Sequence, residues 1–260
     1  MHDTIKNEKA AVLLSEVASD AGAIMLASGA EIYRVEDTVE RIIRSKTNAK
    51  DVDVYSTFNV IILSFTYDNE VHTNVRRVKN RANKLFYVDK VNQFSRDFCS
   101  GKLSLEEALV ELKKIKAAKG KPLFEKILGG GIAAGAFSLL LSGGQDEMAI
   151  SFIVGLLSYY AANFMEQNGI GYFVVNYLYG VIVSILTMIF AHYLPGIESG
   201  IIIVSSMMAL LPGIMITNAM RDLMSGDATS GLTGAVIGIL ISTALAMGVG
   251  TPITIMKIWG

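Results

Sequence analysis

Charged residues are distributed very unevenly along this chain of 260 residues. Of its 23 lysines and arginines, 21 lie between Lys6 and Lys126, and only Arg221 and Lys257 follow. The acidic residues divide 18 to 6 at the same point, which gives the first half a formal net charge of +3. The second half is almost free of charge and carries long apolar runs. A polar domain at 1–121 and a membrane domain at 122–260 are therefore predicted.

The second half contains five apolar stretches of the length that a helix needs to cross a bilayer. In chain order they are about 124–142, 149–165, 172–193, 199–220 and 229–250. Because lysine and arginine favour the cytoplasmic side, we expect the first domain in the cytoplasm, below the plasma membrane. The turns at 143–147 and 195–199 then face outward, and those at 166–171 and 221–227 face inward. The N-terminus lacks the pattern of a signal peptide, and one cysteine fits a reducing compartment.

The fourth apolar stretch is interrupted at Pro212-Gly213. Proline removes a backbone donor and clashes with the preceding helical turn, so the helix is expected to break there. In lipid, freed backbone groups are tolerated only where protein or a wet cavity covers them, and transporters use such breaks to bind solutes. From Ile201 to Leu211 the helix would rise about 16 Å, roughly half the bilayer core. We therefore expect a substrate or gating site near this break.

Polar residues inside apolar stretches are informative because their burial in hydrocarbon is costly. In one interpretation, the helix that restarts after Gly213 directs free N–H groups at a carboxylate, which Asn218 and Arg221 grip. In the other, Arg221 and Asp222 mark the inner water boundary and Asp227 caps the fifth span. The predicted substrate-binding or gating residues are Pro212, Gly213, Thr217, Asn218, Arg221, Asp222, Asp227, Asn163 and Asn176.

The first 121 residues predict a small α+β domain. A helix ends near Gly29 and a second follows, then residues 52–67 favour a strand, with a hairpin turn at Asp68-Asn69. Two further helices follow, and the second of them starts at a capping box, Ser104 to Glu107. No nucleophile–base pattern, Cys/His cluster or phosphate loop occurs, so no catalytic residue, metal or cofactor is predicted. A charge of +3 is too weak to indicate nucleic-acid binding.

Glu31, Arg34 and Glu36 crowd the start of the second predicted helix, directly after Gly29. They are either first-turn residues with a local ion pair, or contacts to the membrane domain or a ligand.

Two segments together resemble the threonine/serine exporter family: GAEIYRVE at 29–36 and PG…N…RDL…GD…SG at 212–231. The resemblance implies proton-driven export of small hydroxy amino acids. Some two-subunit members are associated with dicarboxylates such as succinate. Single-chain members carry about ten spans, so five spans indicate the split form, with a second small membrane subunit and an oligomeric assembly. Family positions include Gly29, Glu31, Arg34, Val35, Glu36, Pro212, Gly213, Asn218, Arg221, Asp222, Gly226, Asp227 and Gly231.

Beside an exporter of a small carboxylate-bearing substrate, two alternatives remain at this stage. One is a membrane-anchored hydrolase that acts through the first domain, although no nucleophile–base pair supports it. The other is a regulatory or assembly subunit whose first domain binds partners.

Overall fold

The structure is a computed structural model that describes residues 4–79 and 81–259. Its contacts divide the chain into two compact units. One unit, named here the N-terminal unit, comprises the chain up to Gly120 together with Ile214–Ala235. The other, named the apolar unit, comprises Lys121–Gly213 and the chain from Val236 onward. The segment after the predicted helix break therefore packs with the first third of the chain.

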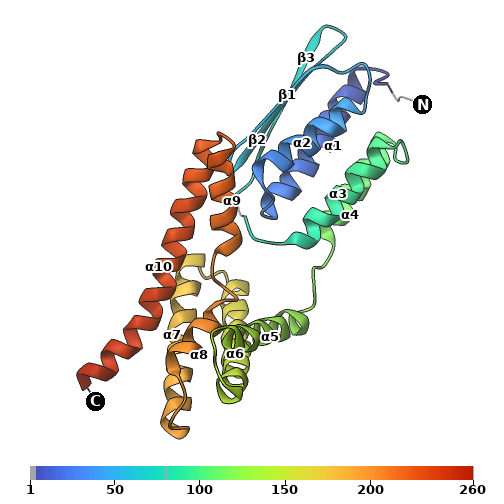
Figure 1. The fold of residues 1–260 in the computed structure, drawn as a ribbon. Coiled ribbons are helices and arrows are strands. Elements are labelled where there is room, and N and C mark those ends of the chain that lie inside the picture. Colours follow the sequence, from blue (N-terminus) through green and yellow to red (C-terminus); the bar gives the residue numbers. More distant parts are fainter. Residues whose placement is uncertain (1–3, 80, 260) are drawn as a thin grey trace. The chain divides into compact units, whose positions relative to one another are not determined.

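The N-terminal unit has three layers: a sheet, the helix pair α1–α2, and the helix pair α3–α4 (Figure 1). Helix α1 spans Glu8–Ala27 and α2 spans Ile32–Arg44. The connection between them turns at Gly29, whose φ of +81° lies in the left-handed region that glycine tolerates. The end of α1 just before Gly29 confirms the prediction.

The sheet is an antiparallel meander of β1 (Lys50–Ser56), β2 (Val60–Tyr67) and β3 (Glu70–Arg77). The prediction of one strand over 52–67 was wrong, because residues 57–59 form a turn that separates β1 from β2. The predicted hairpin turn is confirmed. Asp68 and Asn69 both have positive φ, as a two-residue turn between twisted strands requires.

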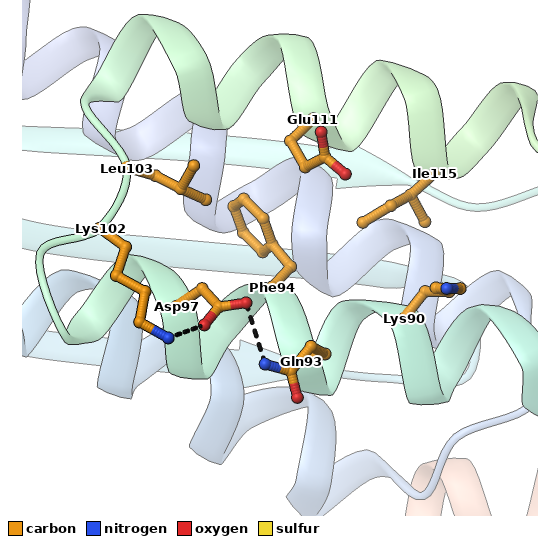
Figure 2. A pocket seen from close by; sticks show the side chains of 8 residues that line it. All are labelled: Lys90, Gln93, Phe94, Asp97, Lys102, Leu103, Glu111 and Ile115. Carbon is orange, nitrogen blue, oxygen red and sulfur yellow. Dashed lines mark hydrogen bonds and ion pairs between the residues drawn. The ribbon is translucent and has the colours of Figure 1, made fainter.

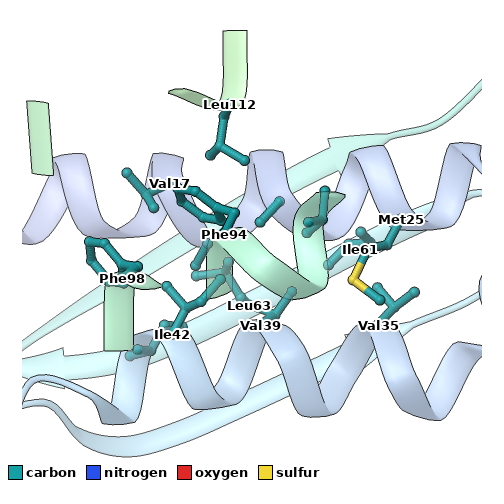
Figure 3. Packing of buried hydrophobic residues seen from close by; sticks show 14 of the residues in the cluster. Val17, Met25, Val35, Val39, Ile42, Ile61, Leu63, Phe94, Phe98 and Leu112 are labelled. Carbon is teal, nitrogen blue, oxygen red and sulfur yellow. The ribbon is translucent and has the colours of Figure 1, made fainter. Parts of the chain in front are cut away.

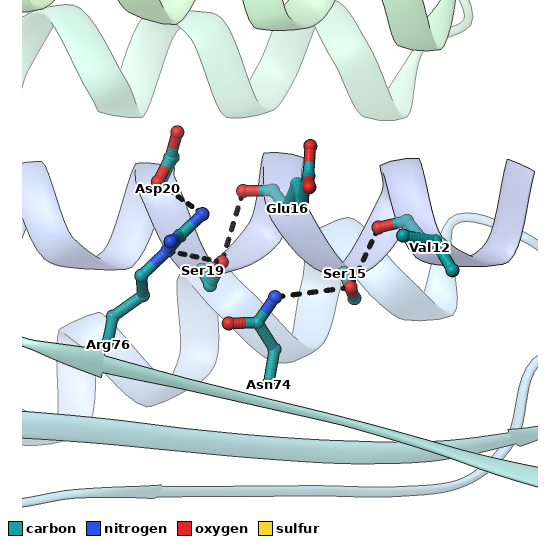
Figure 4. A network of polar contacts seen from close by, with 7 residues as sticks. All are labelled: Val12, Ser15, Glu16, Ser19, Asp20, Asn74 and Arg76. Carbon is teal, nitrogen blue, oxygen red and sulfur yellow. Dashed lines mark hydrogen bonds and ion pairs between the residues drawn. The ribbon is translucent and has the colours of Figure 1, made fainter. Parts of the chain in front are cut away.

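Helices α3 (Leu85–Cys99) and α4 (Leu105–Ala117) complete the N-terminal unit, and α4 starts at the predicted capping box. The hydrophobic core lies between the layers, where the alternating residues Ile61, Leu63 and Phe65 of β2 are fully buried (Figure 3). Polar contacts also join α1 to β3: Arg76 pairs with Asp20 at 3.1 Å (Figure 4). The sheet thus covers one side of α1, and α3 and α4 cover the other.

The apolar unit contains α5 (Leu123–Leu140), α6 (Gln145–Gln167), α7 (Tyr172–Tyr193) and α8 (Ser199–Met207). Helix α9 (Gly213–Met224) and the start of α10 (Ala228–Trp259) belong to the N-terminal unit, and the rest of α10 belongs to the apolar unit. Helix α10 continues beyond residue 250, where the last span is expected to end. Pro252 lies inside α10, because continuing the helix keeps the backbone bonds of an apolar segment internal.

The predicted interruption of the fourth span is present. Helix α8 ends at Met207 and α9 begins at Gly213, so neither piece is long enough to cross a bilayer alone. Among the described residues, five helices have the length and apolarity to cross a membrane: α1, α5, α6, α7 and α10. More than half (56%) of the apolar window of α1 is buried, against 28–39% for the other four. Protein rather than lipid therefore covers much of α1.

Glycines allow helices of the apolar unit to approach closely. A Cβ at Gly155 of α6 would lie 2.5 Å from the Ala134 side chain of α5. A Cβ at Gly180 of α7 would lie 2.5 Å from the Leu245 carbonyl oxygen of α10. Small residues at such crossings are typical of helix packing in membranes.

Candidate functional site

The connection between α1 and α2 gathers hydrogen bonds from distant parts of the chain. Four successive backbone carbonyls, at residues 27–30, each accept a hydrogen bond from another segment. Their donors, in order, are Ala82 N (2.9 Å), Lys84 N (3.0 Å), Asn218 Nδ2 (3.2 Å) and Arg81 Nη2 (2.9 Å). A Cβ at Gly29 would lie 2.6 Å from Asn83 Oδ1, so glycine is required there. The GAEIYRVE segment is therefore a junction for the chain segments around it.

Helix α9 is held on this junction by two side chains. Asn218 donates to the Gly29 carbonyl, and the Arg221 guanidinium forms an ion pair with the Glu31 carboxylate. The Glu31 side chain is only 14% exposed, whereas that of Arg221 is 49% exposed. Residues about 190 positions apart in sequence are thereby brought together within the N-terminal unit.

Asp222 follows Arg221 in α9. It is buried, and its side chain lies beside the N-terminal end of α2. Its carboxylate accepts a hydrogen bond from the backbone N–H of Ile32, the first residue of that helix. The cap residue of α2, Glu31, makes no capping bond with its own side chain, so α9 supplies the anion that this helix end favours. Burial and the nearby charge of Asp227 nevertheless raise the pKa of the Asp222 carboxyl, against the lowering influence of Arg81.

Asp227 lies in the turn between α9 and α10. Gly226, with a φ of +90°, ends α9, and the Asp227 N–H donates to the Asp222 carbonyl at 2.9 Å, a pattern typical of glycine-terminated helices. Asp227 Oδ1 accepts from the Ser230 N–H at 3.4 Å and caps α10. The other oxygen, Oδ2, is buried and has no partner among the described residues. Only one of the two Asp227 carboxylate oxygens therefore takes part in capping α10.

Glu36 of α2 is the third carboxylate of this cluster. Its Oε1 accepts the Ser56 N–H of β1 at 2.7 Å. Burial raises the pKa of the Glu36 carboxyl, the Ser56 bond lowers it, and the charges of Asp227 and Asp222 raise it again. Glu36, Asp222 and Asp227, which we name the carboxylate cluster, therefore interact electrostatically.

Arg81 partly balances the carboxylate cluster. Its guanidinium lies 4.5 Å from the centre of the Phe58 ring and donates to the Ala30 carbonyl. Burial lowers the pKa of Arg81 and the charge of Asp222 raises it. With Glu31 and Arg221 included, the site holds four acidic and two basic side chains, so a bound proton would relieve repulsion within it.

The remaining predicted site residues lie elsewhere. Asn163 accepts a hydrogen bond from Gln167 on α6, and fully buried Asn176 donates to the Tyr172 carbonyl on α7. Pro212 is buried directly before α9, while Gly213 and Thr217 are exposed on α9. These residues are not part of the carboxylate cluster.

Two pockets lie away from the carboxylate cluster. One, of about 360 Å³, lies between α3 and α4 and has Phe94 and Ile115 in its wall, with Lys90 and Asp97 at its rim (Figure 2). The other, of about 260 Å³, is polar and includes Arg34 of the GAEIYRVE segment. Among the described residues, no group of three or more histidine, cysteine or acidic side chains is arranged to hold a metal ion.

Two participants in the site, Arg81 and Ser56, are absent from the residues that the sequence predicts. Arg81 lies in an irregular segment with no recognisable motif, and Ser56 contributes through its backbone N–H. Neither leaves a signal in the sequence, because both act only once the sheet and α2 have come together.

A model of the family ThrE, described as "Putative threonine/serine exporter", matches residues 16–256 of the chain. A relative from Klebsiella aerogenes, named "Probable succinate transporter subunit YjjP", is 23% identical over 98% of this chain and 96% of its own length. The protein of the same name from Escherichia coli K12 is 23% identical over 92% of each chain.

A third relative, named "Threonine/serine exporter", comes from Corynebacterium glutamicum and is 24% identical over 93% of this chain. The match covers 51% of that relative, so this chain spans about half of its length. No solved structure matches the chain.

Proposed function

The chain belongs to the threonine/serine exporter family ThrE, and from this premise we propose that it is one subunit of a secondary-active exporter of small carboxylate-bearing metabolites. Membership and several apolar helices make it a membrane protein of a transporter family. We assign serine and threonine as first-choice substrates, the plasma membrane as the location, and a second small membrane subunit as the partner. The two succinate transporter relatives favour a dicarboxylate as the alternative substrate.

The observation that carries this proposal is the interrupted fourth span. Its second part, α9, carries Asn218, Arg221 and Asp222 and binds the α1–α2 junction through them. The interruption connects an apolar helix, α8, directly to a helix of the N-terminal unit, α9. In our proposal, a movement of α9 is therefore transmitted through the interruption to the transport path. The basic residues concentrated before Lys126 favour a cytoplasmic position for the N-terminal unit.

We assign proton coupling to the carboxylate cluster. Burial and mutual repulsion raise the pKa of Glu36 and Asp222, so a proton binds there more readily than to a free carboxyl. A bound proton lowers the repulsion that opposes docking of α9, and its release weakens that docking. Alternation between the two states would drive movement of α9 during transport.

The test measures efflux of threonine, serine and succinate from cells that lack the chain and its partner, before and after both are restored. Restored chain carrying Asp222→Asn should lose most of the efflux, because the carboxyl can no longer release a proton. Asp37→Asn is the matched control, since Asp37 is an exposed acid of the same unit that pairs with Arg41. The proposal fails if restoring the pair changes the efflux of none of the three solutes. Full efflux by Asp222→Asn would remove only the coupling assignment.

A further inference from the structure

Helices α5 to α8 of the apolar unit bury polar side chains among themselves. The fully buried ones are Ser138 on α5, Ser151 and Ser158 on α6, Asn176, Ser184 and Thr187 on α7, and Ser205 and Ser206 on α8. Burying a polar side chain inside a membrane bundle costs more free energy than burying an apolar one. Polar side chains in the interior of the bundle therefore indicate a solute path. We name this set, with Tyr179, the polar seam.

The middle of the polar seam is satisfied by its own hydrogen bonds. Ser205 Oγ donates to Ser151 Oγ at 2.9 Å, and the Tyr179 hydroxyl donates to the Ser206 carbonyl at 2.6 Å. Ser206 lies in the last turn of α8, where carbonyls have no partner within the helix. The break after Met207 therefore leaves an acceptor that Tyr179 binds.

Outside this hydrogen-bonded middle, three buried side-chain oxygens of the polar seam have no partner among the described residues. One of them, Ser138 Oγ, lies beside Gly143, just before the start of α6. The other two lie on the opposite side. Ser158 Oγ and Asn176 Oδ1 are both buried and have no partner among the described residues. Ser158 lies two turns beyond Ser151 along α6, and Asn176 lies one turn before Tyr179 on α7. Since α7 follows α6 in the opposite direction, both orphaned groups lie toward the turn at 168–171. A buried polar atom without a partner is costly, so these two oxygens are suited to hydrogen-bond a ligand.

The charge around the polar seam limits what it can bind. Of the charged residues described in the apolar unit, only Glu147 is buried, and its carboxylate accepts the N–H groups of Gly144 and Glu198 at the opposite end of α6. The lysines of this unit are all exposed. A dianion would enter a region of low dielectric without a cationic partner, which is strongly unfavourable. A solute with balanced charges and hydroxyl or amide groups meets no such penalty.

We propose that Asn176 and Ser158 bind the solute in the apolar unit, and that the solute occupies this position as a net-neutral species, a zwitterion rather than a dianion. This inference rests on the proposed transport function and identifies the side chains and the charge state within it. Asn176 Oδ1 accepts from an ammonium or hydroxyl group, and the Ser158 hydroxyl donates to a carboxylate or hydroxyl oxygen.

Binding to the purified full chain in lipid nanodiscs tests the proposal, with radiolabelled threonine, serine and succinate as probes. Asn176→Ala and Ser158→Ala should each weaken threonine or serine binding about tenfold, as expected when a hydrogen bond in a buried site is lost. The melting temperature of Ser158→Ala should stay unchanged or rise, because this substitution removes only an unsatisfied polar atom. Asn176→Ala also removes the hydrogen bond to the Tyr172 carbonyl, so its effect is read from binding alone. A purely structural role of Ser158 would lower the melting temperature of Ser158→Ala instead.

The chain offers matched controls for both variants. Asn168 donates to the carbonyl four residues earlier at 2.8 Å, as Asn176 does, but it is exposed. Ser242 of α10 is paired with the Gly238 carbonyl. Asn168→Ala and Ser242→Ala should bind like the unchanged protein.

Two results would overturn the inference. The first is unchanged binding in both seam variants, or no binding of either zwitterion by the unchanged protein. The second is succinate binding at neutral pH that Asn176→Ala abolishes, because a dianion would then occupy the seam. Neither result decides the proposed function, which the cellular efflux of all three solutes tests separately.

Discussion

The ion pair between Glu31 and Arg221 allows a direct test of whether α9 docks on the α1–α2 junction. The perturbation is a double-mutant cycle with Glu31→Gln, Arg221→Gln and the two changes combined. The two single changes are not equivalent. Removing Glu31 leaves Arg221 half exposed to solvent, where its charge is hydrated at little cost. Removing Arg221 leaves Glu31, which is only 14% exposed, without its partner.

The magnitudes follow from this asymmetry. Exposed ion pairs contribute about 0.2–1 kcal/mol, and a poorly solvated charge without a partner costs about 1–3 kcal/mol. We therefore expect Glu31→Gln to cost about 0.5 kcal/mol and Arg221→Gln about 1.5 kcal/mol. The coupling energy between the two sites should be about 1 kcal/mol, since the double variant has neither partner stranded.

Thermal unfolding of the purified full chain gives the three stability changes, and hydrogen exchange shows where they act. Exchange should accelerate at the Ile32 amide and along α9 in Arg221→Gln, because Asp222 holds that amide only while α9 is docked. Arg44→Gln serves as control, since Arg44 pairs with Glu40 on the exposed surface of α2. Additive single effects, with a coupling energy below about 0.3 kcal/mol, would show that the Glu31–Arg221 pair does not hold α9 on the junction.

Two further predictions concern packing and pH. Gly180→Ala places a Cβ 2.5 Å from a backbone carbonyl of α10 and should destabilise the chain by about 1–3 kcal/mol, whereas Gly250→Ala, which meets nothing within 4 Å, should be neutral or stabilising; melting temperatures in detergent decide. For Glu36, the folded-state pKa lies above the ordinary 4.5, so its contribution to stability is complete below that value and is lost as the pH rises through the raised pKa. Melting temperature measured against pH should therefore flatten in Glu36→Gln but not in Glu40→Gln, and equal slopes in both would contradict the assignment.

Secondary structure in this chain follows mostly from local chemistry. The capping box at Ser104, the turn at Asp68-Asn69 and the helix break before Gly213 each depend on residues next to one another. Such signals are visible in sequence because the backbone preference of each residue is set within a few positions. The turn that splits 52–67 was missed, since Thr57 and Phe58 favour strands and only Asn59 does not.

A long apolar segment does not show by itself whether it crosses a membrane or lies in a protein core, because both lipid and protein can cover apolar surface. Helix α1 has the composition of a membrane span, yet it lies between the sheet and α3–α4 in the core of the N-terminal unit. Helix α10 continues past the predicted end through Pro252. In both cases the surroundings of the segment decide its role.

The sequence alone determined the division of charge, the apolar helices, the interruption at Pro212-Gly213 and the two family segments. Only the tertiary structure brought Glu31 to Arg221, Ile32 to Asp222 and Glu36 to Asp227, and only it left Asn176 and Ser158 without partners. The two kinds of feature depend on interactions that act over different distances along the chain. Helix caps and breaks depend on neighbours along the chain, whereas burial, pKa and hydrogen-bond satisfaction depend on neighbours in space.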